Sequence, residues 1–318
     1  GYSNMKVIAS AGREDVAVLY VGEFEDGHCL EFVEALSPPK PRDEKWVLLV
    51  STLYGCPVGC QMCDAGGYYN GRVSSEDIFA QIDYIVGKRY PDLVVPSKQF
   101  KIQFARMGEP AFNPAVLEVL EELPDRYQAA GLMPSMSTIA PAGREDFFER
   151  LLEIKNDHYG GGRFQMQFSI LTTDQTLRNQ VIPVRKWDFA RIAAYGERFF
   201  QPGDRKITLN FALAEGMPVD PEALLECFSP DRFLIKITPL NPTYRAREHS
   251  LNTYIDPARD EIGYHIVSDL RSAGYRVIIS IGEQEENLIG SNCGQYVRRH
   301  MEAKEQISGG YTYPLVDL

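Results

Sequence analysis

The sequence has few cysteines, no long apolar segment and no secretory leader. Its six cysteines are spread over 318 residues, a density far below that of the small secreted domains that depend on disulfides. No run of apolar residues is long enough to cross a bilayer, and the first residues do not resemble a signal peptide. These absences argue against a disulfide scaffold and a membrane partner, and they predict a protein of the reducing cytoplasm.

Basic residues are in the minority. The chain carries 33 Lys and Arg against 44 Asp and Glu, a net charge of −11. Because nucleic-acid binding needs clustered Lys and Arg to neutralise phosphates, this balance argues against a large nucleic-acid interface. Two local basic pieces, Arg245 with Arg247 and Arg298-Arg299-His300, are interpreted as solvated surface.

Three of the six cysteines lie in one short loop. Cys56, Cys60 and Cys63 have C-x3-C-x2-C spacing. Thiolates are the natural ligands of iron–sulfur clusters, and a [4Fe–4S] cluster has four irons to ligate. Three local cysteines therefore leave one iron open for a substrate or cosubstrate. Gly55 and Gly59 allow the loop to fold tightly around such a cluster.

Two other interpretations of this loop are open. Structural zinc would need a fourth ligand from elsewhere, for example His28, and zinc sites usually use two paired units such as C-x2-C, of which only one occurs here. A disulfide framework is disfavoured by the low cysteine density. The cluster is the favoured interpretation.

Strand-like and helix-like segments alternate along most of the chain. The first fifty residues read as extended, with a strand at 16–21 and a hairpin signal at Asp26-Gly27. Further strand candidates lie at 46–50, 100–106, 164–171, 207–213, 233–237 and 277–281. Helix candidates lie after the Ser74/Asp77 capping box, after Asn113-Pro114, and near 144–155, 187–199, 221–228 and 258–273. The alternation predicts βαβ units and a mostly parallel sheet.

The segments that carry chemistry follow three of these strands. The cysteine loop follows 46–50, Met107-Gly108-Glu109-Pro110 follows the next strand, and Asn241-Pro242 follows 233–237. Because ligands of parallel α/β folds bind at the carboxyl ends of the strands, we expect these segments to meet at one rim.

The cysteine loop together with Gly108-Glu109-Pro110 resembles the radical S-adenosylmethionine (SAM) superfamily. In that superfamily the open iron chelates the amino and carboxylate groups of SAM, and electron transfer from the cluster cleaves SAM to a 5′-deoxyadenosyl radical. The resemblance implies that the Gly-Glu-Pro segment contacts the SAM amino group. A carboxylate such as Glu109 suits an ammonium.

Further motifs resemble the RlmN/Cfr family, whose members methylate adenine carbons in ribosomal and transfer RNA. The matching pieces run in order over about residues 45–300: Arg-Met-Gly-Glu-Pro-Ala-Phe-Asn at 106–113, Ser137-Thr138, Phe-Ser-Ile-Leu at 168–171, Leu-Arg-Asn-Gln-Val-Ile-Pro at 177–183, Leu-Asn-Pro at 240–242 and Asn-Cys-Gly-Gln at 292–295.

This resemblance implies roles for four SAM contacts and one thiol. Glu109, Ser137, Ser169 and Asn241 would contact SAM, although each serine taken singly would be an ordinary strand hydroxyl. In the family the cysteine matching Cys293 is first methylated by one SAM, and its methyl group then loses hydrogen to the radical from a second SAM and adds to the substrate. The isolated Cys29 and Cys227 are interpreted as inert thiols.

Three features depart from the family. Its second cysteine, seven residues before the first cluster cysteine, removes a proton and releases the product through a disulfide, and here that position is Leu49. The residue before the third cluster cysteine is usually aromatic and is Met62 here. The family's N-terminal RNA-binding helical domain has no counterpart in the strand-like residues that precede the loop.

The sequence therefore predicts an α/β fold, a partial (β/α)6 radical SAM barrel with a small N-terminal β extension. The expected organisation is a β-rich extension at 1–45, the barrel domain at 46–300 and a C-terminal tail at 301–318. The expected cofactors are a [4Fe–4S] cluster held by the three loop cysteines, and SAM.

The expected function is cleavage of SAM to a 5′-deoxyadenosyl radical, with methyl transfer or substrate linkage through Cys293. A small molecule, a nucleotide or a peptide is the favoured substrate, and flavodoxin or ferredoxin would supply electrons. One alternative is an RlmN-like adenine C-methyltransferase acting on RNA. Another is a non-catalytic iron–sulfur electron carrier or sensor.

Overall fold

The computed structural model describes residues 4–55, 58, 69–213, 216–239, 265–279 and 316–317. The predicted cluster ligands Cys56, Cys60 and Cys63, and also Asn241 and Cys293, lie outside these residues.

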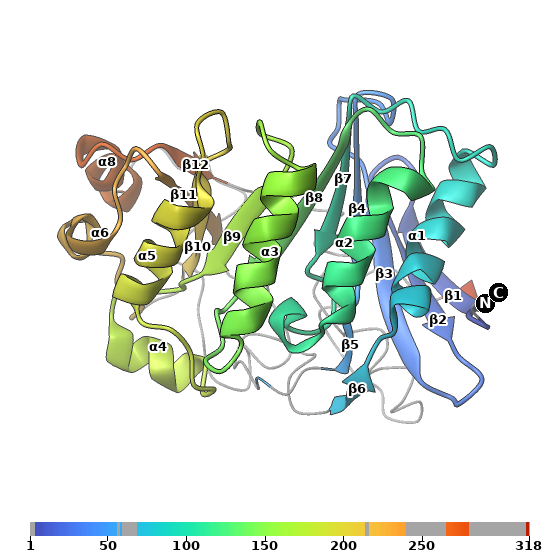
Figure 1. Ribbon diagram of the computed structural model, residues 1–318, viewed down its shortest axis with the longest axis horizontal. Coiled ribbons are helices and arrows are strands. Elements are labelled where there is room, and N and C mark those ends of the chain that lie inside the picture. The colour runs from blue at the N-terminus through green and yellow to red at the C-terminus, as the bar shows by residue number, and fades with distance from the viewer. Residues whose placement is uncertain are drawn as a thin grey trace.

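The centre of the fold is one mixed sheet with the strand order β12-β11-β10-β9-β8-β7-β4-β3-β2-β1-β13 (Figure 1). The strands from β4 to β12 pair in parallel, which confirms the predicted α/β class. They are β4 (Lys45–Val50), β7 (Gln99–Phe104), β8 (Leu132–Thr138), β9 (Gln165–Ser169), β10 (Ile207–Leu213), β11 (Phe233–Pro239) and β12 (Val277–Ile279).

The N-terminal strands continue the same sheet in antiparallel pairing. They are β1 (Lys6–Arg13), β2 (Ala17–Glu23) and β3 (Cys29–Ala35), and β13 (Val316–Asp317) pairs with β1 at the outer edge. β3 pairs with β4, so the predicted N-terminal β extension joins the parallel sheet directly. Gly27, with φ of 85°, allows the β2–β3 hairpin to turn where Asp26-Gly27 predicted it.

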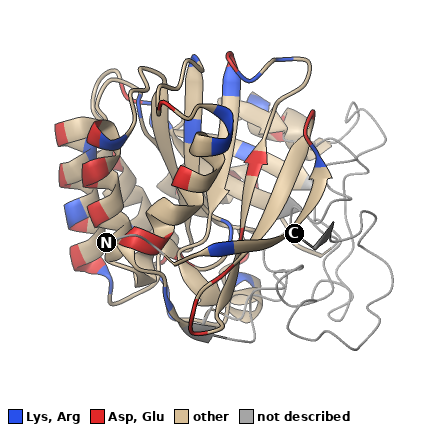
Figure 2. Ribbon diagram, turned by 90° about the vertical axis from the view of Figure 1, so that its right-hand side faces the viewer, with Lys and Arg blue, Asp and Glu red and all other residues tan. Residues whose placement is uncertain are grey.

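The helices lie together on one side of the sheet, as Figure 2 shows most clearly. They are α1 (Ser75–Arg89), α2 (Ala115–Arg126), α3 (Glu145–His158), α4 (Gln175–Val181), α5 (Phe189–Phe199), α6 (Pro221–Cys227) and α8 (His265–Ser272), with the short 3-10 helix η1 (Pro110–Phe112) before α2. The Ser74 side chain accepts a hydrogen bond from the Asp77 N–H at 3.1 Å, which confirms the predicted cap of α1. Among the described helices, none is both long and apolar enough to span a bilayer.

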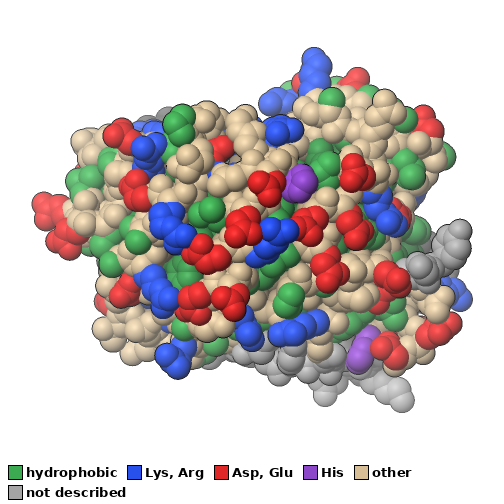
Figure 3. Space-filling model, viewed as in Figure 1, with side chains coloured by type: hydrophobic (Ala, Val, Ile, Leu, Met, Phe, Trp, Pro, Cys, Tyr) green, Lys and Arg blue, Asp and Glu red, His purple; other side chains and the backbone are tan. Residues whose placement is uncertain are grey.

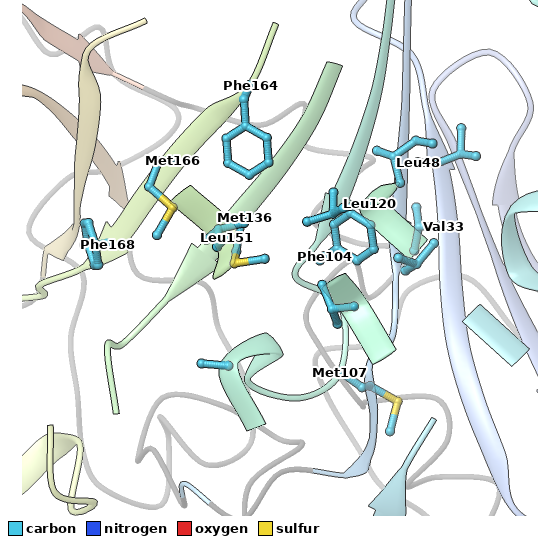
Figure 4. Packing of buried hydrophobic residues seen from close by; sticks show 14 of the residues in the cluster. Val33, Leu48, Phe104, Met107, Leu120, Met136, Leu151, Phe164, Met166 and Phe168 are labelled. Atoms are coloured by element: carbon cyan, nitrogen blue, oxygen red, sulfur yellow. The ribbon is translucent and has the colours of Figure 1, made fainter. Parts of the chain in front are cut away.

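The apolar core lies between the sheet and these helices (Figure 4). On β7, Phe100, Ile102 and Phe104 are fully buried against the helices, while the residues between them face the opposite, inner side of the sheet. The pairing register puts the following residues on that inner face: Lys45, Val47, Leu49, Lys101, Gln103, Ser135, Ser137, Gln165, Gln167, Ser169, Thr208, Asn210 and Lys236. The inner face is therefore mostly polar.

Charges of both signs are interspersed on the helix-covered side of the molecule (Figure 3). Several are paired across neighbouring helices, such as Arg198 with Glu149 at 2.6 Å and Arg191 with Glu145 at 2.9 Å. Exposed pairs of this kind add at most about 1 kcal/mol each to stability. The helix side thus carries the mixed charge of an ordinary solvated surface rather than the basic stripe of a nucleic-acid footprint.

Candidate active site

The carboxyl ends of β4, β7, β8 and β9 point toward the lower part of Figure 1, where β5 (Leu53–Gly55) and β6 (Tyr69–Arg72) also lie. β5 and β6 pair antiparallel and flank the segment that contains the cluster cysteines. Of the predicted SAM contacts, Gly108, Glu109 and Pro110 follow β7, Ser137 lies near the end of β8 and Ser169 ends β9. The structure thus brings these residues to neighbouring strand ends.

The start of the cysteine loop is bound to the turn after β7. The N–H groups of Thr52 and Leu53 donate to the Met107 carbonyl at 2.9 and 3.2 Å. The Met107 N–H donates in return to the Ser51 hydroxyl at 3.1 Å. The loop and the Gly-Glu-Pro segment are therefore one hydrogen-bonded unit.

Gly108 permits this close contact. Its φ is 96°, and a β-carbon added there would lie 2.5 Å from the Leu53 β-carbon and 2.8 Å from the Leu53 nitrogen. Because any other side chain would meet this backbone, only glycine fits without a shift.

Asn113 binds the residues on both sides of the cysteine loop to the same hydrogen-bonded unit. Its amide donates to the Thr52 carbonyl at 2.8 Å and to the Val73 carbonyl at 2.7 Å, which stand on either side of the cysteine loop. Its side-chain oxygen accepts from the Ala115 N–H at 3.1 Å and so caps α2, which begins one residue later than predicted. The sequence suggested only the cap, so the role of Asn113 in holding the loop was missed.

A buried ion pair lies directly before the Gly-Glu-Pro segment. The guanidinium of Arg106 donates to the Glu31 carboxylate on β3 at 2.8 and 3.2 Å, and both side chains are at most 1% exposed. The Ser51 hydroxyl donates to the Glu31 carbonyl at 2.5 Å. The N-terminal strands thus help to hold the site, which the sequence did not reveal because the two charges are 75 positions apart.

Glu109 is buried and turned toward the end of β8. Its carboxylate accepts from the Thr138 hydroxyl and from the N–H groups of Ile139, at 3.3 Å, and Ala111. None of the cationic side chains that the structure describes is paired with it. Burial raises the pKa of Glu109 to about 7, against these hydrogen bonds, which lower it. Three donors leave about one of the four lone-pair positions of the carboxylate free.

The two predicted serines meet across β8 and β9. The hydroxyl oxygens of Ser137 and Ser169 are 3.3 Å apart. Below them Gln167 donates to the Ser135 hydroxyl at 2.9 Å and accepts from Asn210 at 3.0 Å. The hydroxyls therefore head a polar network that runs down the inner face.

Arg178 fixes the strand ends that carry these serines. This buried side chain on α4 donates to the carbonyls of Ser169 at 3.1 Å, Ile170 at 3.0 Å and Ile139 at 3.4 Å. A guanidinium suits this position because its five N–H groups diverge in one plane. The motif at 177–183 thus acts on the site through the backbone of β8 and β9.

His28, the suggested fourth ligand of a zinc site, pairs with Asp26 at 3.0 Å and lies against the ring of Tyr54, with ring centroids 4.9 Å apart. In the part of the chain that the structure describes, no group of three or more His, Cys, Asp and Glu side chains is arranged to hold a metal ion.

A surface hollow of about 460 Å³ opens beside the same rim. It is lined by Ala142, Asn179, Pro183, Val184, Arg185, Lys186, Trp187, Asp188 and Arg191. Its floor is joined to the loop after β8, because the Ala142 N–H donates to the Arg185 carbonyl at 2.9 Å. Arg191 is paired with Glu145 at 2.9 Å, so Arg185 and Lys186 against Asp188 leave the lining weakly basic.

Comparisons with known proteins show what the chain is similar to. No protein-family model matches the chain. It is 28% identical over 297 residues to a probable dual-specificity RNA methyltransferase RlmN of Desulfitobacterium hafniense, covering 88% of this chain and 75% of that protein. It is 23% identical over 313 residues to the dual-specificity RNA methyltransferase RlmN of Syntrophobacter fumaroxidans, covering 93% of this chain and 81% of that protein.

Solved structures show the same fold. A radical SAM methyltransferase from Sphaerobacter thermophilus superposes with a TM-score of 0.70 at 18% identity, covering 92% of this chain and 81% of that one. SuiB of Streptococcus suis, solved bound to S-adenosylmethionine, superposes with a TM-score of 0.51 at 15% identity, covering 75% of this chain and 51% of that one.

The chain is thus a radical SAM enzyme that resembles RlmN, with a [4Fe–4S] cluster and SAM as its cofactors. This finding confirms the predicted partial barrel and removes two alternatives, the zinc site and the non-catalytic electron carrier. Enzymes of this type need a reductant.

Proposed function

We propose that this enzyme cleaves SAM to a 5′-deoxyadenosyl radical and directs that radical at a small molecule, a nucleotide or a peptide. The cluster ligands in this proposal are Cys56, Cys60 and Cys63. The SAM contacts are Gly108, Glu109, Pro110, Ser137, Ser169 and Asn241. Flavodoxin or ferredoxin would supply the electron.

One observation supports the SAM site most strongly, the carboxylate of Glu109. It is buried and has no cationic partner among the described residues, and it lies next to the anchored base of the cysteine loop. A buried carboxylate with a free lone-pair position is stabilised in its charged form by a neighbouring ammonium, such as the amino group of SAM. Gly108 permits the close contact with Leu53 that fixes the backbone beside this carboxylate.

The neighbouring residues would hold and orient SAM rather than react with it. The paired hydroxyls of Ser137 and Ser169 offer donors and acceptors at adjacent strand ends. Arg178 keeps those ends in place, and Arg106 with Glu31 keeps the Gly-Glu-Pro segment in place. Bound SAM and a reduced cluster would supply the radical, and these residues would orient SAM.

The cluster assignment is tested with Cys63→Ala. We expect anaerobically reconstituted wild-type protein to hold about four irons per chain and to form 5′-deoxyadenosine from SAM with dithionite. The variant should lose the iron, the cluster absorbance and all SAM cleavage. Cys227→Ala, at a half-buried position on α6, is the matched control and should keep them. SAM cleavage by Cys63→Ala would overturn the assignment.

Cys293 is proposed as the thiol that carries a methyl group or links to the substrate. The first measurement is peptide mass mapping of Cys293 after anaerobic incubation with SAM and reductant. A methyl group on this thiol supports methyl transfer. An unmodified thiol in protein that does form 5′-deoxyadenosine contradicts it, and would assign the radical to another reaction. Cys293→Ala should keep the cluster and lose product.

A second candidate function is methylation of adenine in RNA, as the names of the relatives suggest. The basic hollow beside Arg185, Lys186 and Arg191 favours it, because such a surface can bind a phosphate. The net charge of −11 and Leu49 in place of the family's second cysteine oppose it. RNA binding that weakens steeply with salt would support this candidate, and no binding at low salt would exclude it.

A further inference from the structure

Three lysines share the inner face of the sheet. Lys45 begins β4, Lys101 lies on β7 and Lys236 lies on β11. The register pairs Lys45 with Gln99, two positions before Lys101, so these two side chains are on the same face. Lys236 pairs with Asn210, which is also on that face. The charge of Lys236 acts on Lys101, although β7 and β11 are separated by three strands in the sheet.

Among the residues that the structure describes, none is a counter-ion to these lysines. Lys101 is only 8% exposed, and within the described part of the chain neither it nor Lys45 or Lys236 makes an ion pair or a side-chain hydrogen bond. A buried ammonium without a partner is unfavourable. Burial first, and then the charges of Lys236, Lys45 and Arg205, lower the pKa of Lys101 to about 7. Burial and Lys45 likewise lower the pKa of Lys236.

A second unpaired group lies beside them. The side-chain oxygen of Asn210 is buried and accepts no hydrogen bond in the described structure, although its amide donates to Gln167. Most buried polar atoms of folded proteins are paired. The inner face therefore presents ammonium donors and a free acceptor, and no carboxylate of the described residues acts on Lys101.

We propose that Lys101 and Lys236, with Lys45, bind the phosphate or carboxylate group of a small-molecule substrate on the inner face of the sheet. This inference rests on the proposed function and narrows its substrate class to small anions. Lys101 pairs with Met133, four residues before Ser137 on β8. Because a strand rises about 3.3 Å per residue, the anion would be bound roughly 13 Å from the serines at the rim. A substrate of that length would place its other end at SAM.

The test is isothermal titration of the cluster-reconstituted full chain with sulfate and with succinate in a low-chloride buffer at pH 6.5. Sulfate replaces a phosphate dianion and keeps its charge from pH 6 to 9, and succinate replaces a carboxylate substrate. We expect saturable binding of at least one of them at one site per chain. Sulfate alone would assign a phosphate, and succinate alone a carboxylate.

Variants show whether the lysines form the site. Lys101→Gln should raise the dissociation constant about tenfold or more, the usual effect of losing a charged hydrogen bond, and Lys236→Gln should raise it several-fold. Lys98→Gln removes an exposed charge just before β7 and should leave binding unchanged. Because Lys101 has no partner to lose, its variant should fold with wild-type cluster content. Absence of saturable binding, or equal binding by Lys101→Gln, would overturn the proposal.

The pH dependence gives an independent readout. The anion binds the charged form of Lys101, so its affinity should be highest below pH 7 and fall up to tenfold per pH unit above it. In Lys101→Gln the affinity for the anion should depend on pH more weakly. The remaining dependence would come from the other charged groups that act on Lys101, which are Lys45, Lys236 and Arg205. This titration needs no turnover. If the enzyme binds the anion but forms no 5′-deoxyadenosine, the proposed function is overturned and the anion site is not. If it forms 5′-deoxyadenosine but binds no anion, only the anion site is overturned.

Discussion

Glu109→Gln separates the charge of this side chain from its size. The glutamine keeps an acceptor for the Ile139 and Ala111 N–H groups, and its NH2 group can donate to the Thr138 hydroxyl, which accepts as readily as it donates. The substitution therefore removes a titrating proton while the hydrogen bonds are kept.

The expected effect on stability follows from the raised pKa. Burial moves the pKa of Glu109 from 4.5 to about 7, so between these values the folded protein holds a proton that the unfolded chain releases. Its contribution to stability is complete below pH 4.5 and is lost as the pH rises through 7. The difference of about 2.5 pH units corresponds to an upper value of about 3 kcal/mol, of which about 2 kcal/mol falls between pH 5.5 and 7.

The assay is urea unfolding of wild type and variant at a series of pH values from 5.5 to 8, without SAM. The free energy of unfolding of Glu109→Gln should rise relative to that of the wild type by about 2 kcal/mol across this range. Glu118→Gln, at an exposed position on α2, should show no such change. Parallel curves for wild type and Glu109→Gln would refute the argument that burial controls this carboxyl group.

The affinity for SAM should also depend on pH through the ionisation of Glu109. An ammonium prefers the ionised carboxylate, so the affinity of the wild type for SAM should increase with pH up to about 7 and then level off. Glu109→Gln should bind SAM about tenfold or more weakly at pH 8 and lose this dependence, because a charge-assisted hydrogen bond is replaced by a neutral one. Equal SAM affinity in the two proteins would place the amino group elsewhere.

Two further substitutions test the unit that holds the cysteine loop. Gly108→Ala should cost about 2–4 kcal/mol, because its methyl group would meet Leu53 at a positive φ, and should lower the iron bound per chain; iron assay and urea unfolding measure both effects. Asn113→Ala should cost about 3–5 kcal/mol, because the carbonyls of Thr52 and Val73 lose their donor and α2 loses its cap, and should also lower iron retention after gel filtration.

Gly108→Ala and Asn113→Ala each have a matched control variant. Gly87→Ala lies in α1 with nothing within 4 Å of the added carbon and should be neutral or slightly stabilising. Asn156→Ala lies at an exposed position of α3 and should change the free energy of unfolding by less than about 0.5 kcal/mol. Wild-type iron retention in Gly108→Ala or Asn113→Ala would show that the loop does not depend on these contacts.

Most strands could be predicted from sequence because their apolar residues alternate strictly. β10 has the predicted bounds, and β7 and β11 begin within one residue of theirs. β8 was not predicted as a separate strand, since Pro134 argues against a central strand and its neighbours are small and polar. In the structure Pro134 pairs with Ile102 of β7 and lies one residue before Ser135, where the pairing of β8 with β9 begins.

The site residues could be predicted where they belong to a contiguous motif, and not where they act from a distance. Glu109, Ser137 and Ser169 were named from sequence and lie at adjacent strand ends. Glu31, which pairs with Arg106, carries no signal, because a glutamate in a strand reads as a solvent-facing residue. Contacts of this kind depend on the strand order, which local periodicity does not determine.

The strand order also explains why the inner-face lysines could not be recognised from the sequence, and it shows where Leu49 lies. In an antiparallel sheet, polar residues that alternate with apolar ones usually face solvent, so Lys101 and Gln103 look like surface residues in the sequence. The parallel order turns them inward, beside Leu49, which pairs with Gln103. Along the strands, Leu49 thus lies between the level of Ser137 and that of Lys101. In the proposed complex this side chain would contact the apolar middle of a substrate whose anion binds Lys101, at the position where the family has its second cysteine. Leu49→Cys should therefore weaken substrate binding without restoring methylation of RNA, and a gain of RNA methylation would contradict this placement.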